Sequence, residues 1–212
     1  MRNRRFAPLL CTAVGVALLG ALSGCDSGGP TAADGDIRPA DAMHFLRPAV
    51  TAPPLANPSV AFYAVRGEDR EAFIYYRPAA GSADSSYFVR FKVPGASLER
   101  RPDGSLIPPG DSVLITINVS DPSRLIVDFQ PSGLRFSAST PAELKLDFGE
   151  ASHDIDGDGD EDAEDVARET QLSIWKQEAP GLPWVRLTSV VDFSAEEVEA
   201  KVIGFTGYAI AY

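Results

Sequence analysis

Apolar and polar side chains alternate with a period of two from about residue 60 to the end of the chain. In YFVRFKV (residues 87–93) the odd-numbered positions are apolar, while Arg90 and Lys92 fall on the opposite face. The same alternation recurs in SVLITINVS (112–120), RLIVDF, AELKLDF, LSIW, WVRL, VEAKVIGF and GYAIAY. Such alternation marks half-buried strands, and the Gly, Pro, Asp and Ser residues between them mark turns. The sequence therefore predicts an all-β protein, an antiparallel β-sandwich of about eight to ten short strands.

The last alternating stretch reaches the end of the chain. Its apolar positions are Tyr208, Ile210 and Tyr212. A strand patterned in this way buries one face in the core. We therefore expect the C-terminal strand to be an integral part of the sandwich.

The first 25 residues have the layout of an export signal. Arg2, Arg4 and Arg5 precede an apolar run over residues 6–22, which ends in small residues at Cys25. This layout indicates a cleaved signal rather than a membrane-spanning helix. Leu-Ser-Gly-Cys (22–25) resembles the lipobox of bacterial lipoproteins, which implies cleavage after residue 24 and lipid on the Cys25 thiol. The expected location is the bacterial cell envelope, with the membrane bound through that lipid; ordinary secretion is the alternative.

Residues 25–59 have the composition of a linker. Six prolines lie between residues 26 and 59, and apolar clusters are few. This predicts a disordered, extended tether that follows the lipidated cysteine and precedes a domain over residues 60–212. The apolar island Met43–Leu46 could dock on that domain or on a partner.

Charge and cysteine content exclude several classes of function. The chain has 19 basic and 30 acidic side chains, and residues 1–24 contain three arginines and no acid. The mature chain therefore keeps 16 basic against 30 acidic residues, a net charge of −14, which argues against a nucleic-acid partner. Its two cysteines are Cys11, in the signal, and Cys25. The folded part thus has no thiol for a disulfide, a nucleophile or a metal site.

Several strand and turn segments resemble the ZU-five β-sandwich of ankyrins, netrin receptors and tight-junction proteins. They are FKVPGASL, DSVLITINVSDP, FQPSGLRFSASTPAELKLDF and FTGYAIAY, spread over residues 88–212 around an acidic insertion. The resemblance implies a binding or scaffold module rather than an enzyme. Some relatives cleave themselves at a His-Phe-Ser step, but the histidine is missing from Gly204-Phe205-Thr206 and from Asp192-Phe193-Ser194. We therefore expect no self-cleavage.

The insertion DIDGDGDEDAED (154–165) follows the spacing of an EF-hand calcium loop, D-x-[DN]-x-[DN]-G-x₅-E. Calcium takes about six to eight oxygen ligands, which one such loop can supply from alternate positions. Gly159 stands where the chain must turn sharply. The candidate ligands are Asp154, Asp156, Asp158, Asp160 through its backbone carbonyl, Asp162 through water, and Asp165.

This loop departs from a complete EF-hand in three ways. Asp165 replaces the usual Glu, as in dockerin-like loops, and Glu161 stands where an apolar residue is usual. No helix is predicted before the loop, whereas residues 163–171 could form one or two helical turns after it. A solvated acidic loop without an ion is the alternative. However, two carboxylates about 6 Å apart repel by roughly 0.7 kcal/mol even in water, so eight together favour a bound cation.

The sequence leads to three functional hypotheses. The first is an envelope lipoprotein that binds an unknown envelope or extracellular protein without catalysis, with a structural Ca²⁺ in the acidic loop. The second is an envelope hydrolase that uses the loop carboxylates and the metal. The third is a sandwich whose acidic loop binds no ion. His44 and His153, the two histidines, lie in no context typical of a catalytic triad.

Overall fold

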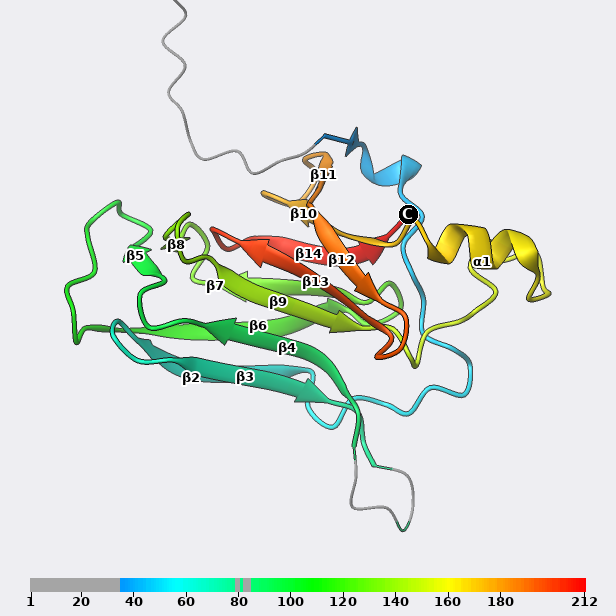
Figure 1. The fold of residues 1–212 in the computed structure, drawn as a ribbon, viewed down its shortest axis with the longest axis horizontal. Helices are drawn as coiled ribbons and strands as arrows, with labels where there is room; N and C mark the ends of the chain where they lie inside the picture. Colours follow the sequence, from blue (N-terminus) through cyan, green and yellow to red (C-terminus); the bar gives the residue numbers. More distant parts are fainter. Residues whose placement is uncertain (1–34, 79–80, 82–84) are drawn as a thin grey trace, which may run out of the picture.

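The computed structural model describes residues 35–78, 81 and 85–212, so the predicted signal and Cys25 lie outside the described residues. Two antiparallel sheets pack face to face (Figure 1). The seven-stranded sheet has the order β1 (Ile37–Arg38), β11 (Trp184–Arg186), β10 (Ser173–Gln177), β14 (Gly207–Ala211), β7 (Ile126–Gln130), β6 (Ser112–Asp121), β2 (Ser59–Val65). The five-stranded sheet has the order β12 (Ser189–Asp192), β13 (Glu197–Val202), β9 (Ala142–Asp147), β4 (Tyr87–Val93), β3 (Arg70–Tyr75).

The alternation seen in the sequence places the core between these sheets. In β6, Val113, Ile115 and Ile117 are 6% exposed or less, and the residues between them face outward. Phenylalanines from four segments fill the middle of the core; Phe91 lies 4.9 Å from Phe129 and 5.6 Å from Phe205, measured between ring centroids. Buried aromatic pairs of this kind add to the hydrophobic stabilisation of a core. The predicted all-β antiparallel sandwich is confirmed.

The described residues form more strands than expected, 14 rather than eight to ten. The additional ones are short. β5 (Leu98–Arg100) and β8 (Arg135–Phe136) form a separate two-stranded sheet, and β1 contains two residues. Segments of two or three residues are too short to show a repeat of period two, so the pattern could not reveal them.

The C-terminal strand is integral, as predicted. β14 lies between β10 and β7 in the seven-stranded sheet, and all five of its residues are buried. Tyr208 and Ile210 face the main core, while Ala209 and Ala211 lie in a second apolar cluster with Trp175 and Trp184. Both tryptophans are at most 2% exposed, so packing accounts for them. The sheet is thus covered on both faces at β14.

The cover over that second cluster is the N-terminal segment, residues 36–58. Met43 and Phe45 pack against the cluster, and the Phe45 ring meets the Trp184 ring edge-on with centroids 5.1 Å apart. Leu46 is 3% exposed, and its N–H donates to the Ile210 carbonyl at 3.0 Å. Residues 36–58 therefore pack against the sandwich, where the sequence predicts an extended tether. The reason is that the apolar island fits the outer face of β14 and β10, which the linker composition alone could not reveal.

The described residues contain one α-helix, α1 (Ala163–Glu169), directly after the acidic stretch, besides the 3₁₀ turn η1 (Ala40–Ala42). The predicted short helix after the loop is confirmed. Its first turn is capped by Asp162, whose carboxylate accepts the Glu164 N–H at 2.6 Å. Asp165 in turn accepts the Asp162 N–H at 3.0 Å, which completes a capping box. Within the described part of the chain, no helix is long and apolar enough to cross a membrane.

Candidate metal-binding loop

The acidic loop lies between β9 and β10 in the chain, leads into α1, and lies at one end of the sandwich (Figure 1). Its base is joined to the last residue of the chain and to the N-terminal segment. The Tyr212 hydroxyl donates to the Ile155 carbonyl at 3.2 Å, and the Ser152 N–H donates to the Arg47 carbonyl at 2.8 Å. Ile155 itself packs against the main core. The loop is therefore held where the C-terminal strand and the N-terminal segment meet.

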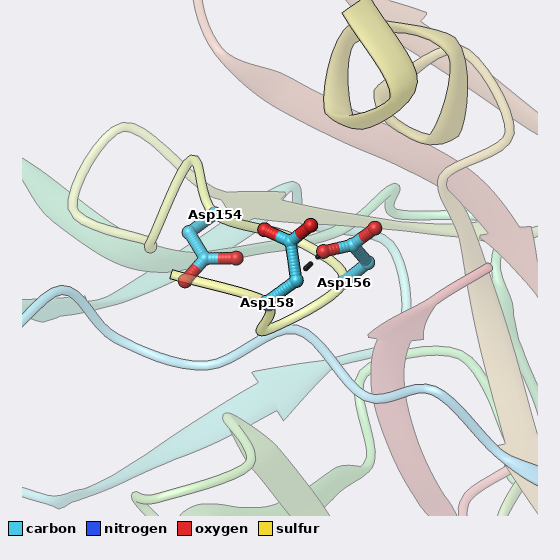
Figure 2. A group of neighbouring side chains, drawn as sticks. All are labelled: Asp154, Asp156 and Asp158. Carbon is cyan, nitrogen blue, oxygen red and sulfur yellow. Dashed lines mark hydrogen bonds between the residues drawn. The ribbon is translucent and has the colours of Figure 1, made fainter. Parts of the chain in front are cut away.

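The first half of the loop gathers three carboxylates. One carboxylate oxygen from each of Asp154, Asp156 and Asp158 lies within 4.8 Å of the others. Figure 2 shows these carboxylates side by side on the loop, each from an alternate position of the chain. We call this group the first aspartate triad. Its oxygens form the type of donor set that hard cations prefer.

The backbone of the loop supports this arrangement. The carboxylate of Asp154 accepts the N–H groups of Gly157 at 2.8 Å and Gly159 at 3.1 Å, and Asp156 accepts the Asp158 N–H at 3.1 Å. Both glycines have positive φ, +80° and +105°, with open space around the position of a Cβ. The requirement for glycine is therefore conformational rather than steric. The D-G-D-G alternation in the sequence allows the chain to turn around the first aspartate triad.

The second half of the loop forms a separate group, Asp160, Asp162 and Asp165, which we call the second aspartate triad. Asp165 is 4% exposed and accepts three backbone N–H groups, those of Ile155, Asp156 and Asp162, at 2.8, 3.2 and 3.0 Å. These hydrogen bonds hold the pKa of the Asp165 carboxyl below its usual value, since they favour the charged form. Asp165 therefore closes the loop by joining its first residues to the start of α1.

The negative charge of the loop is only partly compensated. The charge of Asp158, and after it that of Asp162, raises the pKa of the Asp160 carboxyl above its usual value. The Arg168 guanidinium, on α1, forms an ion pair with Asp156 and a second one with Glu164 at 3.2 Å. Because Arg168 is a single cation among eight carboxylates, the loop retains a large negative charge.

The structure thus brings the six predicted ligands together as two triads rather than as one shell. The sequence predicts Asp165 as the last of the six ligands and does not show its contacts to the backbone. The signal for them was present, since Asp162 and Asp165 have the spacing of a capping box before a helix. The ion pair of Arg168 is not predictable from the sequence, because a contact across twelve residues depends on how α1 folds back over the loop.

Neither of the two histidines belongs to the aspartate triads. The His44 ring stacks on the Tyr212 ring with centroids 5.1 Å apart, and His153 is exposed at the edge of the loop.

A scan of protein-family models, a search of curated proteins and a search of solved structures each find no match to this chain. The resemblance to the ZU-five family accordingly stays a prediction.

Proposed function

We propose that this chain is a calcium-binding β-sandwich protein in which the ion is held by the first aspartate triad. The observation that carries the proposal is the convergence of three carboxylates from alternate residues, Asp154, Asp156 and Asp158, within 4.8 Å. Three carboxylates at that separation repel one another, so a divalent cation between them stabilises the loop. The donors are all oxygens, which favours Ca²⁺ over a transition metal. The Asp160 carbonyl and water are the natural further ligands.

A structural ion fits this geometry better than a calcium sensor. Sensors respond by opening a pair of helices around the loop. Here the loop follows strand β9, and the helix after it, α1, has seven residues. The loop is also attached to Tyr212 and to the N-terminal segment. Bound calcium would therefore stabilise the end of the sandwich where those segments meet.

We infer that this protein is a bacterial envelope lipoprotein, anchored through lipid on Cys25. Its role is non-catalytic: it binds or scaffolds an envelope or extracellular protein. The support is the arginine-rich, apolar start of the chain, which ends in Leu-Ser-Gly-Cys. The two-sheet antiparallel architecture is compatible with a ZU-five-like module, although many families share that architecture.

The test is calcium titration of the purified full chain by calorimetry, together with thermal unfolding in 2 mM Ca²⁺ and in excess EGTA. A ligand that binds only the folded state stabilises it by about 2.7 kcal/mol at a hundredfold excess over Kd. At roughly 2–4 °C per kcal/mol for a chain of this size, calcium should raise Tm by several degrees.

The informative variant is Asp156→Ala/Asp158→Ala, which removes two of the three carboxylates, whereas Asn is a permitted ligand at both positions of the calcium-loop pattern. The matched control is Glu161→Gln, which removes one charge from the same loop at a position with no ligand role. We expect the double variant to lose the calcium-dependent rise and the control to keep it. No rise in the natural chain, or an equal loss in both variants, would show that the loop holds no specific ion. Magnesium serves as a comparison, because it demands a smaller octahedral site.

A further inference from the structure

A cavity of about 520 Å³ opens next to the small β5–β8 sheet. In Figure 1 this sheet lies at the end of the sandwich opposite α1 and the acidic loop. The cavity is lined by three arginines, Arg100, Arg101 and Arg135, and its apolar lining includes Pro102, Phe136 and Ile203. None of the six loop aspartates lines it, whereas Glu99 and Asp103 do. Its volume falls in the range of about 300–1,000 Å³ that is common for small-ligand sites.

Two of these arginines are paired across the small sheet. Arg100 on β5 and Arg135 on β8 are register partners in the antiparallel ladder, next to a register shift between Leu98 and Arg100. Like charges on neighbouring strands repel each other. A second, hydrophobic partner pair, Leu98 and Phe136, holds the two strands together despite this repulsion.

The charges around the cavity compensate the arginines unequally. Arg101 forms an ion pair with Asp111 at 3.0 Å. Arg100 lies 3.6 Å from Glu99 and donates to the Gly104 carbonyl at 3.0 Å. In contrast, the Arg135 guanidinium has no hydrogen bond or ion pair with any residue that the structure describes. Arg135 is exposed and lines the cavity, so its guanidinium is available to a ligand there.

From this geometry we propose that the cavity binds a small organic anion, a carboxylate or phosphate that carries an apolar group. The oxyanion bridges the guanidinium groups of Arg100 and Arg135, which line the same cavity, because a planar guanidinium donates paired hydrogen bonds that match carboxylate and phosphate oxygens. The apolar group contacts Pro102 and Ile203. The bound anion also removes the repulsion between the two arginines, so binding stabilises the fold.

The experiment is a titration of the purified full chain, followed by NMR and calorimetry at fixed ionic strength, with four probes: phenyl phosphate, benzoate, inorganic phosphate and benzyl alcohol. We expect saturable binding of phenyl phosphate or benzoate, weaker binding of inorganic phosphate because it lacks the apolar group, and no binding of neutral benzyl alcohol. Arg135→Gln should weaken the binding by roughly tenfold or more, as loss of a charge-assisted hydrogen bond implies. Phenyl phosphate against benzoate distinguishes a phosphate ligand from a carboxylate ligand.

The control variant is Arg47→Gln, which removes an exposed arginine at the end of the molecule that carries the acidic loop, and it should leave the binding unchanged. Arg135→Gln should melt at the same temperature as the natural chain or higher, because it removes a like-charge pair, so a loss of binding would not reflect unfolding. The proposal is overturned if neither organic anion binds, if Arg135→Gln binds them equally well, or if benzyl alcohol binds as tightly. It is also overturned if sedimentation shows a dimer that Arg135→Gln dissociates, since a second copy of the chain would then cover the cavity.

Discussion

The substitution Leu46→Ala tests whether the N-terminal segment belongs to the folded unit. Leu46 is 3% exposed, packs in the main core and lies on the segment that the sequence predicts to be a tether. Truncation of a buried leucine costs about 2–5 kcal/mol, from the lost hydrophobic transfer and the cavity that remains. We expect a loss near the lower half of that range, about 3 kcal/mol, since a segment at the periphery can partly relax into the space.

The assay is thermal unfolding of the full chain, followed by circular dichroism. At roughly 2–4 °C per kcal/mol, a loss of about 3 kcal/mol lowers Tm by roughly 6–12 °C. Val50→Ala is the matched control, because Val50 lies in the same segment and is fully exposed at 104%. It should change the free energy of unfolding by less than about 0.5 kcal/mol.

The reasoning would be refuted if Leu46→Ala melted together with Val50→Ala and the natural chain. The segment would then be undocked in solution, as the linker composition predicts. Hydrogen exchange gives a second readout. The Leu46 N–H donates to the Ile210 carbonyl, so a docked segment should protect that amide while the Val50 amide exchanges fast.

Three other predictions concern pH, the base of the loop and the C-terminus. Burial raises the pKa of Asp147 to about 7, and the charge of Glu196 reinforces the shift. The unfolded chain then releases this proton near pH 4 and the folded chain only near pH 7, so stability should fall as the pH rises through that window. In thermal melts over this pH range, Asp147→Asn should lose less stability as the pH rises than the natural chain, and it should be the more stable protein at pH 8. An unchanged dependence of stability on pH would contradict the raised pKa of Asp147. Tyr212→Phe removes the hydrogen bond to the Ile155 carbonyl and should cost about 1 kcal/mol in urea unfolding, with weaker calcium binding; unchanged unfolding would mean that the bond does not form in solution. Deletion of residues 207–212 removes the central strand β14 and should abolish folding; a cooperative melt of the truncated chain would disprove it.

The sequence determined the features that depend on local pattern. Period-two alternation places Val113, Ile115 and Ile117 on one face of β6 wherever that strand packs, because successive side chains of a strand point to opposite faces. The glycines and aspartates of the acidic loop likewise determine the local conformation of its backbone. Gly157 and Gly159 permit positive φ, and Asp154 lies close enough in sequence to accept their N–H groups.

Only the tertiary structure decided which distant segments meet. The apolar island Met43–Leu46 allows docking, but the sequence does not show where Leu46 and Phe45 dock, since that apolar surface is assembled from β14, β10 and β11, more than a hundred residues away. Arg100 and Arg135 likewise become neighbours only through the pairing of β5 with β8. Local patterns set the conformation of each segment, whereas long-range contacts depend on how the complete set of strands buries its apolar area. The loop carboxylates could therefore be identified from the sequence, whereas the docking place of the N-terminal segment and the arginine-lined cavity could not.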